Sequence, residues 1–168
     1  MADIRHSRIL DTGIPGLRDA CVVIVRTQWN ADTVDVLESG CRESLIAAGL
    51  SSIPVITVPG AVEIPFAVRR YWETHQDEPG RPAAFITLGC VLRGETPHFE
   101  WVCKTITDGV LQLNLILPVP VIFGVLTVDN AQQAADRSGG SHGHKGKEAA
   151  ATAIQMIGFN RSLNHPTR

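Results

Sequence analysis

The sequence predicts an α/β fold, a three-layer α/β/α sandwich around a four-stranded parallel sheet with flavodoxin-like winding. Short apolar runs alternate strictly along the chain with longer segments in which apolar residues recur at helical spacing. The runs are nearly continuous, which is typical of strands buried on both faces, and the strict alternation indicates right-handed crossovers between parallel strands. Ligands in such sheets bind beyond the carboxyl ends of the strands, so the residues after each strand are the first candidates for a functional site.

Each element follows from a local pattern. The first strand, residues 21–25, is an unbroken apolar run, and residues 31–50 then show the apolar periodicity of a helix. A later helix over residues 98–117 has Thr96 as its expected N-cap and Pro97 at its first helical position. By the same criteria, the other strands are expected over residues 53–58, 83–92 and 120–126, and the other helices over residues 61–76, 130–137 and 147–163.

Three segments fall outside this alternation. Residues 1–18 are polar with scattered apolar positions, and we expect an N-terminal arm that is either disordered or paired with the sheet edge of another subunit. Residues 19–168 then form a single domain. Residues 77–82 are expected to form an exposed connection, and residues 138–147 a mobile glycine-rich loop.

Composition excludes several classes of protein. With 168 residues, of which 44% are hydrophobic, the chain is long enough for one substantial core. A formal net charge of -2 leaves no basic face for nucleic acid, and no apolar run approaches the roughly 20 residues that span a bilayer. The polar N-terminus lacks the apolar core of a secretory signal, and the four cysteines are scattered without a CxxC pair. We therefore expect a soluble protein of the reducing cytoplasm.

The segment after the third strand, from Gly89 to Glu100, carries the most chemistry. It runs from an apolar strand through a short loop into a helix. The free N–H groups and the positive end of the helix dipole would attract a phosphate or carboxylate. His98, in the first turn, can give and take protons near neutral pH. The same histidine could equally be a solvated surface residue, so this segment alone leaves both interpretations open.

The other strand ends also offer candidate ligand-binding residues. Trp29, which follows the first strand, is either a stacking platform for a planar heterocycle or a tryptophan that packs a helix. After the second strand, Gly60 lets the backbone approach a ligand. Glu63 either accepts hydrogen bonds from hydroxyl groups or simply complements the helix dipole. The fourth strand ends in residues 123–127.

The glycine-rich loop matches no common cofactor motif. In the register of a GxxxxGK[ST] phosphate loop its first position is Ser141 and its last is Glu148, so that motif fails. His142 and His144 lack a third ligand at metal-binding spacing, and no GxGxxG follows a strand. We therefore expect neither a metal nor a dinucleotide cofactor. Arg137, at the end of the preceding helix, remains a candidate phosphate clamp.

Ordered motifs give the chain a resemblance to a known family. They are Trp29-Asn30, Pro59-Gly60-Ala61-Val62-Glu63-Ile64-Pro65, the segment Gly89 to Phe99 and the segment Val121 to Thr127, followed by Asp136-Arg137 and Gly143-His144-Lys145-Gly146. Together, from about residue 20 to residue 161, they resemble 6,7-dimethyl-8-ribityllumazine synthase. The combination of PGxxEIP with RGxTxH makes the resemblance specific, since either motif alone is weak.

The resemblance implies a cofactor-free condensation, the penultimate step of riboflavin biosynthesis. Its substrates are 5-amino-6-(D-ribitylamino)uracil and 3,4-dihydroxy-2-butanone 4-phosphate, and it releases phosphate and water. By resemblance, His98 would be the general acid/base. The pyrimidine and its ribityl chain would contact Trp29, Asn30, Gly60, Ala61, Val62, Glu63, Cys90, Val91, Leu92 and Phe123. The phosphate would be bound by Glu95, Thr96 and Arg137.

The family also implies an assembly. Members form pentamers with active sites at subunit interfaces, and Arg137 and Phe123 would come from the adjacent subunit. Pentamers assemble further into decamers or sixty-subunit shells, and Trp29 together with the loop features favours the decamer.

Two departures from the family leave alternatives open. A lysine often stands four residues beyond the phosphate-binding arginine, where this chain has Ser141, so phosphate binding is weakened unless Lys145 reaches the site. Trp29 replaces a phenylalanine of many members, and its larger stacking surface predicts that riboflavin or another flavin also binds. A flavin-binding or storage protein with weak catalysis is therefore the main alternative to an enzyme, and a plain flavodoxin-like binding domain is the other.

Overall fold

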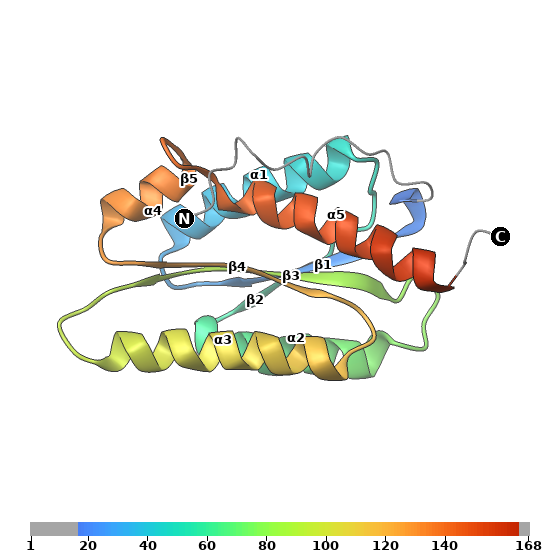
Figure 1. The fold of residues 1–168 in the computed structure, drawn as a ribbon, viewed down its shortest axis with the longest axis horizontal. Helices are drawn as coiled ribbons and strands as arrows, with labels where there is room; N and C mark the ends of the chain where they lie inside the picture. The colour runs from blue at the N-terminus through green and yellow to red at the C-terminus, as the bar shows by residue number, and fades with distance from the viewer. Residues whose placement is uncertain (1–16, 165–168) are drawn as a thin grey trace.

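The computed structural model describes residues 17–164, whose four-stranded sheet lies between two layers of helices (Figure 1). Its strands are β1 (Cys21–Thr27), β2 (Val55–Val58), β3 (Pro82–Leu92) and β4 (Val121–Val128). The helices are α1 (Ala31–Ala47), α2 (Ile64–His75), α3 (His98–Ile116), α4 (Ala131–Arg137) and α5 (Lys145–Asn164). The short elements are the 3₁₀ turns η3 (Leu17–Asp19) and η4 (Ala61–Glu63) and the antiparallel strands β5 (Ser138–Gly140) and β6 (Gly143–His144).

The main sheet is parallel throughout, with the strand order β2-β1-β3-β4. The chain winds outward from β1 to β2 and then returns past β1 to form β3 and β4. The order therefore reverses between β1 and β3, which confirms the predicted flavodoxin-like winding. All four carboxyl ends lie at one end of the sheet, so the segments that follow β1, β2 and β3 meet there.

Alternating side chains of the strands build two hydrophobic cores. In β1, Val22 and Ile24 pack with α1 and α5, whereas Val23 and Val25 pack with α2 and α3. Figure 1 shows α1, α4 and α5 on one face of the sheet and α2 and α3 on the other. Because both faces are covered, successive residues are all apolar, and this explains the continuous runs in the sequence.

The predicted order of strands and helices is confirmed, although several ends shift. Helix α1 ends at Ala47, before Gly49, whose φ of 95° is incompatible with a continuing helix. Strand β2 begins only at Val55, and β4 continues to Val128. These shifts leave the segments at the carboxyl ends of the strands where the sequence predicts them.

Two local predictions are wrong. Thr96 is not the N-cap of α3, because the backbone of Pro97 already has helical angles (φ -61, ψ -3) and Pro97 occupies that position without a side-chain cap. The glycine-rich segment 138–147 is not an irregular loop but contains the β5–β6 pair and the start of α5. Its glycines permit close packing, since a Cβ on Gly140 would lie 2.9 Å from the carbonyl oxygen of Ala135.

The predicted N-terminal arm, residues 1–18, lies almost wholly outside the described residues, and its pairing with another subunit stays a prediction. Within residues 17–164, no helix has the length and apolar character needed to cross a membrane.

Candidate functional site

Trp29 and Asn30 lie directly after β1, at the carboxyl end of the sheet. Asn30 is the residue before α1, and its backbone is left-handed, with a φ of 57°. Its Nδ2 donates a hydrogen bond of 2.7 Å to the carbonyl oxygen of Cys90 in β3. Trp29 has 72% of its surface exposed, so it is not the helix-packing tryptophan that was one of the two alternatives. Its indole ring is therefore available for stacking.

The segment after β2 lies beside Trp29. A Cβ placed on Gly60 would lie 3.5 Å from Cδ1 of Trp29 and 3.1 Å from Oε2 of Glu63. That carboxylate accepts a hydrogen bond of 2.9 Å from the backbone N–H of Gly60, so Glu63 closes its own turn. Between these two residues, Ala61 is buried and Val62 is 43% exposed. Trp29 therefore lies beside the start of the turn formed by residues 60–63.

The end of β3 contributes mainly backbone groups. Cys90 is only 6% exposed, and burial raises the pKa of its thiol, which keeps the thiol neutral. Its carbonyl group already accepts the Asn30 side chain. Val91 is half-buried, and Leu92 is 41% exposed. The predicted contact with a ligand through backbone atoms is consistent with this burial.

Arg93 holds the loop between β3 and α3, a role that the sequence analysis missed. Its Nε donates a hydrogen bond of 2.6 Å to Asp129, which follows β4, and its second contact is with Glu100 of α3. The guanidinium carbon also lies 4.1 Å from the ring centroid of Phe99. The hydrogen bonds from Arg93 are the main reason that the pKa values of Asp129 and Glu100 are lowered. The ends of β3 and β4 and the start of α3 are therefore tied together.

The first turn of α3 and the loop before it contain the residues that the sequence predicts for anion binding. His98 is the first residue of the helix and is exposed, as are Glu95 and Thr96 in the loop before it. Among residues 17–164, the imidazole of His98 has no hydrogen-bond or ion-pair partner. The first backbone N–H groups of a helix lack intrahelical acceptors and carry partial positive charge. An exposed imidazole thus stands beside a surface that favours anions.

Arg137 and Phe123 lie in a different place, along the outer edge strand β4. They line a cavity of about 490 Å³ together with Asp136, His142 and Lys145. Arg137 ends α4, as predicted, and its guanidinium donates to the carbonyl oxygen of His142 and, at 3.1 Å, to Oε2 of Glu148. The side chain is 24% exposed, so part of the guanidinium remains accessible from the cavity.

The β5–β6 pair that supports Arg137 packs tightly against α1. A Cβ on Gly40 would lie 2.3 Å from the ring of His144, and a Cβ on Gly146 would lie 2.0 Å from the carbonyl oxygen of Leu37. Neither glycine could therefore become alanine without displacing its neighbour. Burial lowers the pKa of His144, and nearby Lys147 lowers it further. His144 is a packed structural residue, and His142 faces the cavity instead.

Lys145 does reach the cavity, whereas Ser141 does not line it. The Nζ of Lys145 lies 3.7 Å from Oε2 of Glu148, the same oxygen that holds Arg137. The sequence did offer a signal for Glu148, because an acidic residue three positions after a lysine in a helix can form an ion pair with it. Within residues 17–164, no cluster of three or more metal-ligating side chains exists.

The predicted residues therefore divide into two sets. We call Trp29, Asn30, Gly60–Glu63, Cys90–Leu92, Glu95, Thr96 and His98 the strand-end set, and Phe123 with Arg137 the edge set. None of the strand-end set is among the described residues that line the cavity of the edge set. Strand β4 lies between the two sets. Its residues 126–128 pair with Cys90–Leu92 of β3, and residues of the same strand line the cavity.

Comparison with known proteins gives one consistent result. The family model of 6,7-dimethyl-8-ribityllumazine synthase matches residues 19–161. Proteins of that name from Parabacteroides distasonis and Porphyromonas gingivalis are 42% and 41% identical to this chain, and each alignment covers 88% of the chain and 90% of the relative. The one from Bacteroides fragilis is 43% identical, with 84% of the chain and 96% of the relative covered. The similarity thus extends over both sets of candidate residues.

Proposed function

The chain belongs to the 6,7-dimethyl-8-ribityllumazine synthase family, and from this premise we propose that its two sets of candidate residues form one active site across the contact between two subunits. The chain is a transferase of riboflavin biosynthesis. It condenses 5-amino-6-(D-ribitylamino)uracil with 3,4-dihydroxy-2-butanone 4-phosphate and releases phosphate and water. The main observation in support is that the edge set and the strand-end set lie on separate parts of one chain. Neither set alone therefore contains all the residues expected of the active site.

The strand-end set binds the pyrimidine substrate. Trp29 stacks on the pyrimidine ring, since its indole is exposed and lies beside Gly60. Residues 60–63 hold the ribityl chain, whose hydroxyl groups match the carboxylate and backbone groups of this turn. Backbone groups of Cys90–Leu92 contact the edge of the pyrimidine. The Asn30 hydrogen bond supports this arrangement because it keeps the two strand ends at a fixed separation.

The phosphate of the second substrate binds at the start of α3. The free N–H groups near Glu95 and Thr96 provide donors, and Arg137 of the adjacent subunit supplies a guanidinium that can grip two phosphate oxygens. Lys145 adds a second positive charge in the cavity of that subunit. Phe123, from the same cavity, covers the pocket on the adjacent side.

His98 moves the protons that the reaction requires. The amine of the pyrimidine attacks the ketone and water leaves, a step that needs a proton on the departing oxygen. Elimination of phosphate needs a proton removed from carbon, and ring closure needs a further proton transfer. One exposed imidazole that has no partner among residues 17–164 can serve these steps in turn. Holding both substrates together supplies much of the remaining acceleration.

The same proposal extends to assembly and to a second ligand. We propose a pentamer, assembled further into a decamer, in which residues 1–18 pair with the sheet of a neighbouring subunit and residues 19–168 form the single domain. Trp29 supports riboflavin binding at the pyrimidine site. A cytoplasmic location is supported by the four free cysteines, because free thiols persist in a reducing compartment.

A mixed-assembly experiment tests the shared site. His98→Ala alone should slow lumazine formation by about 10²–10⁴-fold without abolishing it. Arg137→Ala alone should impair binding of the phosphate substrate. If the two variants are co-expressed in equal amounts, half of the sites keep His98 and half of those keep Arg137. About a quarter of wild-type activity should then return, since each site draws on two subunits.

The outcome separates a shared site from a site within one chain. In a control mixture, His98→Ala is co-expressed with Arg93→Lys, because Arg93 belongs to neither set. The activity of this control mixture should equal the mean of its two parents. Activity of the His98→Ala and Arg137→Ala mixture that never exceeds the mean of its two parents would contradict a site shared between subunits.

A further inference from the structure

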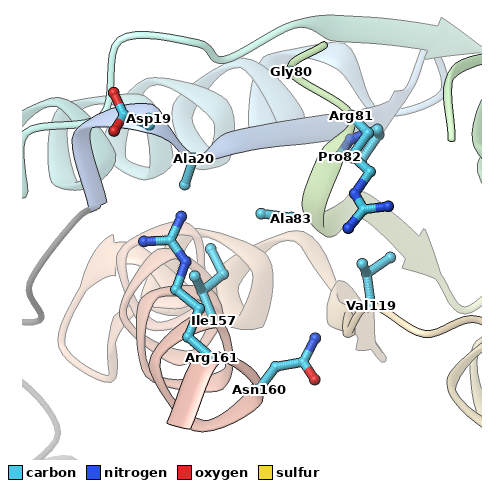
Figure 2. A pocket seen from close by; sticks show the side chains of 10 residues that line it. All are labelled: Asp19, Ala20, Gly80, Arg81, Pro82, Ala83, Val119, Ile157, Asn160 and Arg161. Carbon is cyan, nitrogen blue, oxygen red and sulfur yellow. The ribbon is translucent and has the colours of Figure 1, made fainter. Parts of the chain in front are cut away.

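A second cavity lies at the end of the sheet opposite the proposed active site. Its volume is about 290 Å³. It is lined at the amino ends of the strands by Ala20, just before β1, and by Pro82 and Ala83 of β3. The last turns of α5 close its other side (Figure 2). The strand-end set follows the carboxyl ends of the strands, so this cavity is a separate place on the molecule.

Two arginines from distant parts of the sequence line this cavity. Arg81 precedes β3 and is exposed, whereas Arg161 comes from α5 and is half-buried. Figure 2 shows their guanidinium groups on either side of Ala83. The Arg81 guanidinium has no carboxylate partner within residues 17–164. Asp19 is the single carboxylate among the described residues that line the cavity, whereas two of those residues are arginines.

The surface between the two arginines is apolar, and its residues are part of the packed core. Ala20 and Ile157 are 1% and 2% exposed and belong to the core between the sheet and α5. Asn160 is anchored as well, because its Nδ2 donates a hydrogen bond of 3.0 Å to the carbonyl oxygen of Pro118. The cavity therefore combines a rigid apolar floor with two cationic groups, as ligand sites commonly do.

We propose that this cavity binds a small organic phosphate between Arg81 and Arg161. The planar fork of a guanidinium matches two phosphate oxygens, and each guanidinium carries five N–H donors that can be shared among contacts. The apolar floor suits a short carbon chain attached to the phosphate. A volume of about 290 Å³ lies at the lower limit of ligand sites, roughly 300–1,000 Å³, which favours a short sugar phosphate over a nucleotide.

Titration calorimetry with glycerol 3-phosphate tests this site. The assembled full-length protein carries Arg137→Gln, which weakens phosphate binding at the proposed active site and so reduces the contribution of that site to the signal. Adding Arg81→Gln and Arg161→Gln should weaken binding by about tenfold or more, since the phosphate loses its charge-assisted contacts. Arg18→Gln is the matched control, because Arg18 is exposed close to Asp19 in sequence but does not line the cavity.

The measurements separate loss of the site from loss of the fold. In an otherwise wild-type chain, Arg81→Gln and Arg161→Gln should keep the rate of lumazine formation, and Arg81→Gln alone should keep the melting temperature. The single variant Arg81→Gln, at an exposed position, gives the same test if the double variant is unstable. Equal binding with and without these substitutions, equal weakening by Arg18→Gln, or no saturable binding at millimolar probe would each overturn the proposal. The proposed active site is judged separately, by lumazine formation in the wild-type protein.

Discussion

Asn30 joins two strand ends, because its Nδ2 donates a hydrogen bond of 2.7 Å to the carbonyl oxygen of Cys90, which lies 60 positions further along the chain. The same residue has a left-handed backbone with a φ of 57°, a conformation that glycine and asparagine tolerate far better than other residues. One side chain therefore both shapes the turn after β1 and fixes its distance from β3. These are the two segments that we assign to the pyrimidine.

Substitution of Asn30 can separate these two effects. Asn30→Gly keeps the left-handed turn and removes the hydrogen bond, which should lower the free energy of unfolding by about 1 kcal/mol. Asn30→Ala also strains the turn and should cost about 1–2 kcal/mol more. Both variants should raise KM for the pyrimidine substrate. Urea unfolding and steady-state kinetics measure the two effects, and equal stability of the two variants would show that the turn is not strained.

The sequence predicts the fold well because the fold depends on local periodicity. The apolar run of β1 indicates a doubly covered strand, and the structure buries Val22–Val25 completely. The link between Asn30 and Cys90 could not be predicted in this way. It depends on the side-by-side positions of β1 and β3, which only the folded sheet defines.

Arg93 and the glycine-rich segment mark the limit of local reasoning for the site. The partners of Arg93, Asp129 and Glu100, lie on different elements, and no spacing rule connects a loop arginine with a residue 36 positions away. In residues 138–147 the many glycines indicated mobility, but Gly146 is required by the close approach of Leu37. Glycine content alone does not distinguish a flexible segment from a tightly packed one.

Lys145 should compensate for the missing lysine at position 141. It lines the cavity that contains Arg137, whereas Ser141 is outside it. Lys145→Ala should therefore raise KM for the butanone phosphate by about tenfold, the loss of one charged contact to phosphate, with kcat little changed. Ser141→Lys should lower KM if the added charge reaches the phosphate. Lys104→Ala, on the exposed surface of α3, is the control, and an effect on KM equal to that of Lys145→Ala would contradict a specific role.

The packing of His144 predicts a stability that falls in mild acid. Burial is the main reason that the pKa of His144 lies below its ordinary value in the folded protein. The unfolded chain therefore binds the proton more readily, so the contribution of His144 is complete above about pH 6.5 and is lost as the pH falls through the folded-state pKa. Of the charged groups around it, Lys147 strengthens this effect, whereas Glu43 and Glu148 oppose it.

Melting temperatures between pH 8 and pH 5 measure this contribution. The decrease should be smaller in His144→Asn than in the wild type, because asparagine does not titrate. His142→Asn, at the exposed histidine two positions earlier, should retain the full decrease. Identical pH profiles for the wild type and His144→Asn would show that the buried imidazole does not control the acid sensitivity.

Trp29 should give the protein an affinity for riboflavin. Its indole is 72% exposed and borders the turn at Gly60, so a flavin ring can stack where the pyrimidine binds. Riboflavin fluorescence should be quenched on titration with the protein, and the pyrimidine substrate should compete. Trp29→Ala should weaken binding by about fivefold or more, since aromatic stacking contributes about 1 kcal/mol, and Trp29→Phe should have an intermediate effect. Trp101→Phe, at an exposed tryptophan of α3 outside both sets, should leave the quenching unchanged. No quenching up to high micromolar protein, or equal quenching by the Trp29→Ala variant, would refute stacking at this position.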